Sequence, residues 1–160
     1  MSDSLFDYPD AVGHLSDDDF VFLPEWSEDE WAQLLRHAEA RSFEAGDLVI
    51  RSGDTENSLA IIAEGHLEVL RPRGRLGRLA VVHVCRTGSV IGEQAFVDGR
   101  PRSATVRAVS AGRLLRLGRD NFETFSGHYP ALARRFLYDL ARILSLRLRQ
   151  ANALLEREGR

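Results

Sequence analysis

The first element that the spacing of apolar positions predicts is a helix. Ser27 is a suitable N-cap and Glu30 follows three residues later, which together form a capping box. Trp26 and Trp31 flank the box as a hydrophobic staple. The apolar positions then recur at helical spacing, so we predict a helix that reaches about Ala40.

From residue 42 onward the pattern changes to that of short strands separated by glycine-containing turns. Short strands at close and regular spacing are typical of an antiparallel sandwich or barrel. The predicted strands, with one hairpin loop over 72–78, are 48–50, 59–63, 67–71, 79–85, 105–109 and 114–117.

Helical spacing returns near the end of the chain. A second capping-box pattern over 120–123 predicts a short helix that Gly127 ends. Pro130 suits the first turn of a long last helix, which we expect to reach about Glu156. The fold class predicted from these patterns is mainly β: an antiparallel β-roll of the jelly-roll type, with an N-terminal helix and a long C-terminal helix.

Two apolar stripes run along the predicted last helix. Phe136, Leu140 and Ile143 form a stripe that can pack on the strands. The second stripe alternates steps of four and three residues, which is the seam of a coiled coil. It favours a homodimer, because it continues past the length needed to cover a small barrel; the alternative is one amphipathic helix docked on its own domain. The seam residues are Leu137, Ala141, Leu144, Leu148, Ala151 and Leu155.

Composition narrows the class of protein. The chain has 160 residues, enough for one domain, and we expect an acidic lead-in over 1–22 followed by a domain over 23–157. No apolar run is long enough for a membrane helix, and the first residues do not resemble a signal peptide. Cys85 is the only cysteine, which favours a reducing, cytoplasmic location.

Charge is distributed unevenly along the chain. All 21 basic residues are arginine, so chemistry that depends on lysine, such as a P-loop or a Schiff base, is excluded. Residues 1–54 hold 3 Arg against 14 acids, and residues 55–160 hold 18 Arg against 10 acids. This asymmetry indicates an anionic ligand or an internal electrostatic clasp, unless both sets are simply solvated.

The segment 88–105 carries the residues best suited to bind a ligand. Gly92 lets the backbone approach a ligand closely, and a helical turn that starts at Glu93 has free N–H groups that attract an anion. Arg102 offers a planar fork of donors for phosphate oxygens, and Glu93 offers acceptors for a hydroxyl. These features fit a ribose phosphate; an Arg–Glu surface pair in a long loop is the other interpretation.

This segment resembles the phosphate-binding cassette of the cyclic-nucleotide-binding domain family, as in catabolite-activator-like regulators and cyclic-nucleotide-gated channels. The matching positions are 92–95 and 101–105, and the spacing from Glu93 to Arg102 is that of the family. The likeness extends through Phe43–Asp47 and Ile61–Gly65 and covers about residues 22–150. It implies a stand-alone cyclic-nucleotide-binding domain.

The resemblance assigns roles to individual positions. Glu93 is expected to accept the ribose 2′-hydroxyl, Arg102 to pair with the cyclic phosphate, and Gly92 to keep the loop close to the sugar. The remaining phosphate contacts are expected from the Ser103 hydroxyl and from the backbone N–H groups of Gln94, Ala95 and Ala104. The helix over 130–156 is expected to act as a lid, with candidate lid residues Arg142, Leu144, Arg147, Leu148 and Arg149.

The expected function is therefore to bind a cyclic mononucleotide, cyclic AMP in preference to cyclic GMP, and to relay binding to an unidentified effector protein by movement of the last helix. The alternative is a protein-interaction module that kept the fold without the ligand. We expect no enzyme activity, no cofactor besides the ligand, no metal and no contact with membrane. Direct DNA binding is not expected either, because few residues remain after Leu155 for a helix-turn-helix domain.

Overall fold

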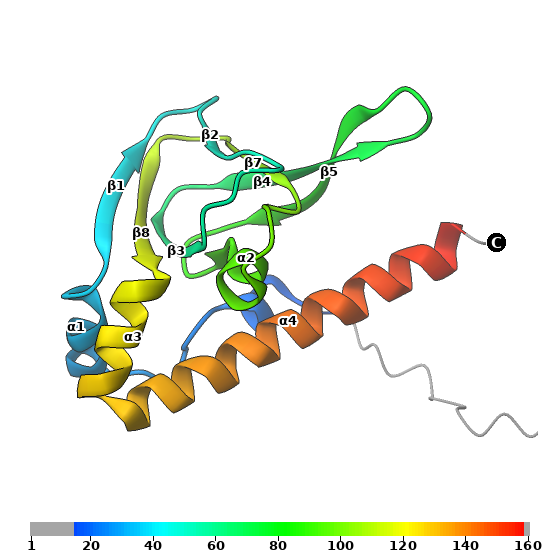
Figure 1. Cartoon of the computed structure of the whole chain (residues 1–160). Coiled ribbons are helices and arrows are strands. Elements are labelled where there is room, and N and C mark those ends of the chain that lie inside the picture. Colours follow the sequence, from blue (N-terminus) through cyan, green and yellow to red (C-terminus); the bar gives the residue numbers. More distant parts are fainter. Residues whose placement is uncertain (1–14, 159–160) are drawn as a thin grey trace, which may run out of the picture.

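Eight strands form two antiparallel sheets, with helices at both ends of the described chain (Figure 1). The structure is a computed structural model that describes residues 15–158. In chain order its elements are η1 (Asp17–Phe20), α1 (Glu28–Leu35), β1 (Glu39–Phe43), β2 (Leu48–Ile50), β3 (Ser58–Glu64), β4 (Leu67–Arg73), β5 (Arg78–Cys85), β6 (Val90–Ile91), α2 (Glu93–Asp98), β7 (Thr105–Ala108), β8 (Gly112–Gly118), α3 (Arg119–His128) and α4 (Pro130–Glu158).

The order of the strands is that of a β-roll. One sheet has the order β1-β8-β3-β6 and the other has the order β2-β7-β4-β5, so consecutive strands repeatedly change sheet. The longest pairings are antiparallel, β3 with β8 and β4 with β5. The predicted jelly-roll type of fold, with a helix before it and a long helix after it, is confirmed.

The core has two parts. One part lies between the sheets and includes Leu67, Cys85 and Val106, all of which are buried. The other lies beneath the helices and is rich in phenylalanine, where Phe96, Phe122 and Phe136 contact one another. This second part fixes α2, α3 and α4 against the sheets, so it positions the segment expected to bind the ligand.

Helix α4 buries one predicted stripe and exposes the other. Phe136, Leu140 and Ile143 are at most 1% exposed, so this stripe packs on the domain as predicted. On the neighbouring face, Leu137, Leu148 and Leu155 are exposed. In Figure 1, α4 runs past the rolled sheets toward the β4–β5 hairpin side of the molecule. No helix within residues 15–158 is long and apolar enough to cross a membrane.

The first helix is shorter than predicted. The capping box of Ser27 and Glu30 is present, but α1 ends at Leu35 and not near Ala40. Residues 39–43 form β1 instead, which pairs along its whole length with β8. A local helical pattern cannot anticipate this result, because the partners of these residues in β8 are 69–77 positions away in the sequence.

The predicted start and end of α3 are also wrong. The helix begins at Arg119, directly after β8, and its N-cap is Gly118, which has no side chain to form a cap. Gly127 lies inside the helix, which continues to His128. Pro130 does open α4, as predicted. The packing of Phe122 and Phe125 in the core keeps the helical turn that contains Gly127 in place.

Residues immediately before the predicted domain boundary at 23 pack against the domain. Phe20 and Phe22 are buried, and Phe22 packs edge-on against Phe136 of α4. Arg142 of α4 donates hydrogen bonds to the carbonyl oxygens of Asp19 and Val21, so this stretch is bound to the helix. The rest of the predicted lead-in, residues 1–14, lies outside the described residues.

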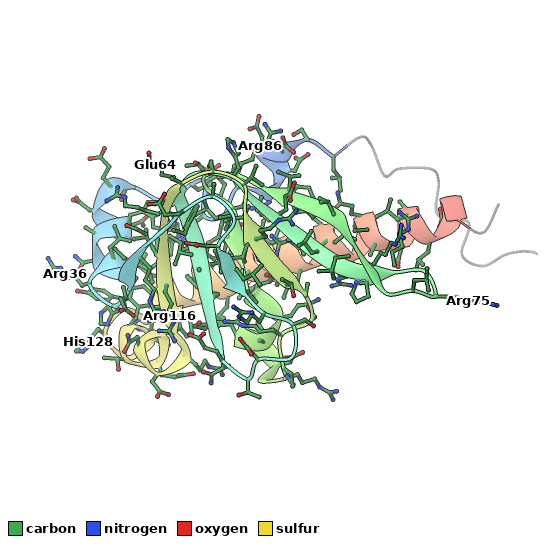
Figure 2. The ribbon with its side chains drawn as sticks, turned by 90° about the horizontal axis from the view of Figure 1, so that it is seen from above. Arg36, Glu64, Arg75, Arg86, Arg116 and His128 are labelled. Carbon is green, nitrogen blue, oxygen red and sulfur yellow. The ribbon has the colours of Figure 1, made fainter. Side chains whose placement is uncertain are left out.

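The β4–β5 hairpin extends away from the rest of its sheet (Figure 1). Arg75 lies at its tip and points away from the body of the molecule (Figure 2). The exposed side chains of Leu76, Leu79 and Val81 also belong to this hairpin. The hairpin therefore presents apolar and cationic side chains together.

Gly112 should be among the positions least tolerant of a side chain. A Cβ there would meet the carbonyl oxygen of Glu64 and the ring of Phe43, neither of which can move freely. Gly112→Ala should therefore lower the free energy of unfolding by about 1–3 kcal/mol, measured by urea denaturation. Gly118→Ala at the other end of β8 is the control, since its Cβ meets only the Arg116 guanidinium at 3.9 Å. Equal losses in both variants would contradict the prediction.

Candidate functional site

Gly92 places the start of α2 against Arg102. Its φ of 73° is in the left-handed region, which favours glycine. A Cβ at this position would collide with the Arg102 guanidinium and come within 3.0 Å of the Ser58 carbonyl oxygen. Glycine is therefore needed both for the backbone conformation and for the space that the arginine occupies.

The backbone of Arg102 is held by the turn after β2. The amide of Arg102 donates to the carbonyl oxygen of Asp54 at 2.7 Å, and its own carbonyl accepts from the amide of Gly53 at 2.9 Å. This turn was predicted from sequence as a strand boundary, without a role in the site. It fixes where the Arg102 side chain enters the interior.

The Arg102 side chain is buried, with 7% exposure, and it bonds to uncharged oxygens. Nη1 donates to the carbonyl oxygens of Ser58, at 2.6 Å, and Gly92, at 2.9 Å; Nη2 donates to the Ser58 hydroxyl at 3.1 Å. Burial lowers the pKa of Arg102, because a charged group is less stable away from water. The guanidinium keeps its charge, since arginine stays protonated in proteins.

Three of the five N–H groups of Arg102 therefore have partners within residues 15–158. The two that remain are Nε–H and one hydrogen of Nη2. They lie on the same edge of the guanidinium, because the Nη1–Nη2 edge faces Ser58. That edge is the fork that matches two oxygens of a phosphate or carboxylate.

Glu93 connects the site to α4. Its carboxylate is 7% exposed and lies 2.5 Å from Nη1 of Arg147, whose Nη2 donates to the Val90 carbonyl oxygen at 2.6 Å. Burial alone would lower the pKa of Arg147, but the ion pair and hydrogen bond with Glu93 outweigh it and raise the pKa. Nε of Arg147 is buried and finds no hydrogen-bond partner among residues 15–158.

The other predicted ligand-binding positions lie around the same turn. Ala95 and Ala104 are buried, whereas Gln94 and Ser103 are exposed. The Ser103 hydroxyl donates a short hydrogen bond to the Gln94 side-chain oxygen. The structure thus brings all seven predicted residues to one locality, with Gln94 and Ser103 at its outer edge.

The predicted lid residues differ in where they point. Arg147 reaches Glu93, as described. Arg142 is engaged by Asp139 and by the carbonyl oxygens near η1, so it faces away from the predicted ligand site. Leu144 is half-buried, and Leu148 and Arg149 are exposed. Within this predicted set, Arg147 is the residue that joins α4 to the site.

Two residues of this site were not predicted from sequence. Ser58 accepts two hydrogen bonds from Arg102, and the Glu56 carboxylate accepts a hydrogen bond from the Ser58 hydroxyl at 3.0 Å. Both stand just before or at the start of β3, far from the predicted segment in sequence. The sequence contains no periodicity or spacing that would have identified them.

Cys85 and His83 lie nearby on β5. Burial raises the pKa of the Cys85 thiol to about 11, so it is an unreactive core residue at neutral pH. Burial and the adjacent Arg147 lower the pKa of His83. Within residues 15–158 no three His, Cys, Asp or Glu side chains are grouped to hold a metal ion.

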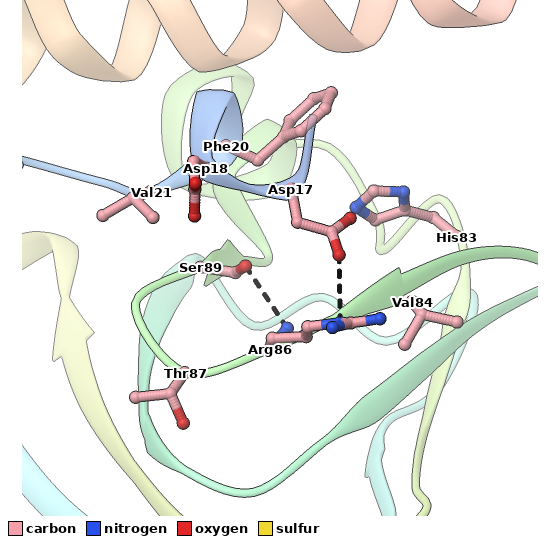
Figure 3. A pocket seen from close by; sticks show the side chains of 9 residues that line it. All are labelled: Asp17, Asp18, Phe20, Val21, His83, Val84, Arg86, Thr87 and Ser89. Carbon is pink, nitrogen blue, oxygen red and sulfur yellow. Dashed lines mark hydrogen bonds and ion pairs between the residues drawn. The ribbon is translucent and has the colours of Figure 1, made fainter. Parts of the chain in front are cut away.

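A cavity of about 320 Å³ lies between η1 and the end of β5, apart from Arg102 (Figure 3). Asp17 and Arg86 form an ion pair across it at 3.2 Å, and the Ser89 hydroxyl accepts from the Arg86 amide. Phe20 contacts the ring of His83 on one wall. Two of its charged side chains, Asp17 and Arg86, thus already pair with each other.

Comparison with known proteins identifies the family. The family model of the cyclic nucleotide-binding domain matches residues 40–129, more than half of the chain. The chain belongs to this family. The segment predicted as the cassette, from Gly92 to Thr105, lies within the matched residues and contains the buried charged residues Glu93 and Arg102.

Individual relatives of this family are considerably longer than this chain. A cAMP-dependent protein kinase regulatory subunit of Emericella nidulans is 29% identical over 68% of this chain and 26% of its own length. Glutaminase 2 of Bradyrhizobium diazoefficiens is 34% identical over 83% of this chain and 20% of its own length. The chain thus spans about a quarter or less of these relatives.

A solved structure shows the same fold. A cyclic nucleotide-binding domain from Methylobacillus flagellatus superposes with a TM-score of 0.77, covering 88% of this chain and 83% of its own, at 21% identity. This similarity supports the fold, in which α2 lies between the rolled sheets and α4 (Figure 1).

The Glu93–Arg147 pair should contribute to stability mainly through its buried carboxylate. Arg147→Ala leaves Glu93 buried without its cationic partner and should lower the free energy of unfolding by about 2–4 kcal/mol, measured by urea denaturation. Adding Glu93→Gln to that variant should recover most of the loss, because the uncompensated charge is gone. Arg149→Ala, two residues along the exposed face, is the control. No recovery in the double variant would contradict this account.

Proposed function

We propose that the chain binds a cyclic mononucleotide at the cassette. The observation that carries the proposal is Arg102, a buried cation whose hydrogen bonds go to uncharged oxygens and whose Nε edge keeps two donors available. Glu56 and Glu93 offset part of the cost of burying this charge through space, but the hydrogen-bond acceptors of its guanidinium within residues 15–158 are all uncharged. A cyclic phosphate carries one negative charge and two exocyclic oxygens, which suits that edge.

The sugar would be recognised by Glu93. In this proposal its carboxylate accepts the ribose 2′-hydroxyl, while Gly92 keeps the backbone close to the ring. The Ser103 hydroxyl and the amides of Gln94, Ala95 and Ala104 complete the phosphate contacts. We favour cyclic AMP, which the kinase regulatory subunit among the relatives names in its description, with cyclic GMP as the competing ligand.

The signal would leave the site through α4. Arg147 ties the helix to Glu93, so a ligand that changes the contacts of Glu93 also changes the position preferred by α4. Such a shift requires only that the nucleotide bind the two helix positions with different affinity. The helix would pass this change to an effector protein in the cytoplasm, or to a further part of a longer protein.

The exposed seam of α4 would join two copies of the chain. Leu148 is 62% exposed and Leu155 is 67% exposed, although both are large and apolar. Exposed apolar side chains at alternating steps of four and three residues are what a coiled-coil dimer buries. We therefore propose a homodimer through α4.

The rival function is a protein-interaction module that kept the fold and does not bind nucleotide. In that case the contacts of Arg102 and Glu93 serve stability alone. Calorimetric titration of the chain with cyclic AMP, cyclic GMP and linear 5′-AMP separates the two. Saturable binding of a cyclic nucleotide, with little binding of 5′-AMP, supports the proposal, and no binding of either cyclic nucleotide overturns it.

Arg102→Ala should weaken cyclic-nucleotide binding roughly 30-fold or more, because removing one partner of a buried charged contact costs about 2–5 kcal/mol. Arg100→Ala is the matched control, since Arg100 is an exposed arginine two positions earlier. Circular dichroism confirms that both variants fold. Equal affinities in a folded Arg102→Ala protein and in the wild type would disprove the phosphate role.

Leu148→Glu should convert the dimer to a monomer, since it places a charge in the middle of the proposed seam. Sedimentation velocity measures the change. Tyr138→Glu is the control, because Tyr138 is 74% exposed on the same helix but lies outside the seam positions. A wild-type chain that sediments as a monomer at all concentrations would refute the proposed dimer.

A further inference from the structure

Ser58 determines how the Arg102 guanidinium is held. It is 3% exposed at the first position of β3 and accepts from Arg102 twice, through its carbonyl oxygen and through its hydroxyl. The two contacts occupy the Nη1–Nη2 edge of the guanidinium. They leave the Nε edge turned away from β3.

The Ser58 hydroxyl is itself oriented by Glu56. It donates to the Glu56 carboxylate at 3.0 Å, and a hydroxyl has only one hydrogen to donate. Its lone pairs are then directed toward Nη2 of Arg102. Without an acceptor at position 56, the hydroxyl could rotate and direct its hydrogen toward the guanidinium, which has no lone pair to receive it.

Glu56 is also held by Arg116 of β8, which bonds to the same carboxylate oxygen as Ser58. Nε of Arg116 donates to that oxygen at 2.5 Å, and the same guanidinium lies 3.8 Å from Glu39. Burial raises the pKa of Glu56, but the hydrogen bonds from Arg116 and Ser58 outweigh this effect and lower it, so the carboxylate is ionised at neutral pH. Arg116, Glu56 and Ser58 thus form a continuous chain that ends at Arg102.

We propose that Glu56 and Arg116 are positioning residues that act through Ser58 to aim the Nε edge of Arg102 at the nucleotide phosphate. This inference rests on the proposed function, because the phosphate that Arg102 would contact is that of the proposed cyclic nucleotide. Linked hydrogen bonds polarise one another, so loss of the distal carboxylate weakens the bond from Ser58 to Arg102. The guanidinium then loses orientation while its charge remains.

Glu56→Gln tests the proposal by removing the charge at nearly constant shape. It should weaken cyclic-nucleotide binding about 3- to 10-fold in calorimetric titration, as expected for one hydrogen bond in a charged network. Ser58→Ala should have an effect of similar size. The double variant should be no more than about 2-fold weaker than Ser58→Ala alone, because Glu56 acts through that hydroxyl.

Glu64→Gln is the matched control. Glu64 stands at the end of β3 farther from Glu56 in the sequence and is paired with Arg113 of β8 at 3.9 Å. It is therefore another Glu–Arg pair that involves β8, without a contact to Arg102. Its nucleotide affinity should equal that of the wild type. Equal weakening in Glu64→Gln and Glu56→Gln, or additive losses in the double variant, would overturn the positioning role.

A second measurement does not need nucleotide. In the chain with labelled arginine side chains, NMR should show slow rotation of the Arg102 guanidinium, and Glu56→Gln should accelerate it, whereas Glu64→Gln should not. Unchanged rotation in Glu56→Gln overturns the positioning proposal. The wild type could show the rotation effect and yet bind neither cyclic nucleotide. That result overturns the proposed function and the contact of Arg102 with phosphate, but it leaves the orientation of Arg102 by Glu56 established.

Discussion

The burial of Arg102 is the constraint on which the site depends. A guanidinium in the interior needs acceptors for its donors, and here the carbonyl oxygens of Ser58 and Gly92 and the Ser58 hydroxyl accept from three of its five N–H groups. This requirement explains why position 92 is glycine, because a side chain there would occupy the space of the guanidinium. It also explains why the turn at 53–54 must close on the Arg102 backbone. Sheet, turn and short helix are thus arranged around one cation.

Helix α4 is attached to the rest of the domain by charged side chains at two separate points. At one point Arg147 pairs with Glu93 of the cassette; at the other Asp139 and Arg142 bind the backbone between Asp19 and Leu23. The fully buried apolar stripe, from Phe136 to Ile143, lies along the second of these points. A movement of α4 at the cassette end therefore need not break the contacts near η1. The ion pair of Arg147 with Glu93 joins α4 to the cassette, beside the packing of Phe96 on Phe136. An ion pair can exchange partners more readily than a packed core can.

The sequence was most informative where structure depends on local spacing. Alternation predicted most of the strands, and the buried stripe of α4 was predicted residue by residue. It failed at β1 and at the start of α3, where pairing across the sheet and packing of Phe122 decide the outcome. Resemblance to a known family located the cassette, but Ser58 and Glu56 could not be found in this way. Their importance comes from the hydrogen bond between Arg102 and the Ser58 hydroxyl, which exists only after β3 and the cassette have come together.

The charge asymmetry of the chain has a structural explanation that differs from ligand binding. Acids from the first third pair with arginines from the later part: Asp17 with Arg86, Glu30 with Arg135, and Glu39 with Arg116. These pairs form the electrostatic clasp that was one interpretation of the sequence. Their side chains are exposed or half-exposed, so solvent screens these pairs and a neutral substitute would cost little. Arg102 differs from them because it is buried and bonded to uncharged oxygens. An excess of arginine is therefore weak evidence for an anionic ligand. The hydrogen-bond partners of one buried arginine are much stronger evidence.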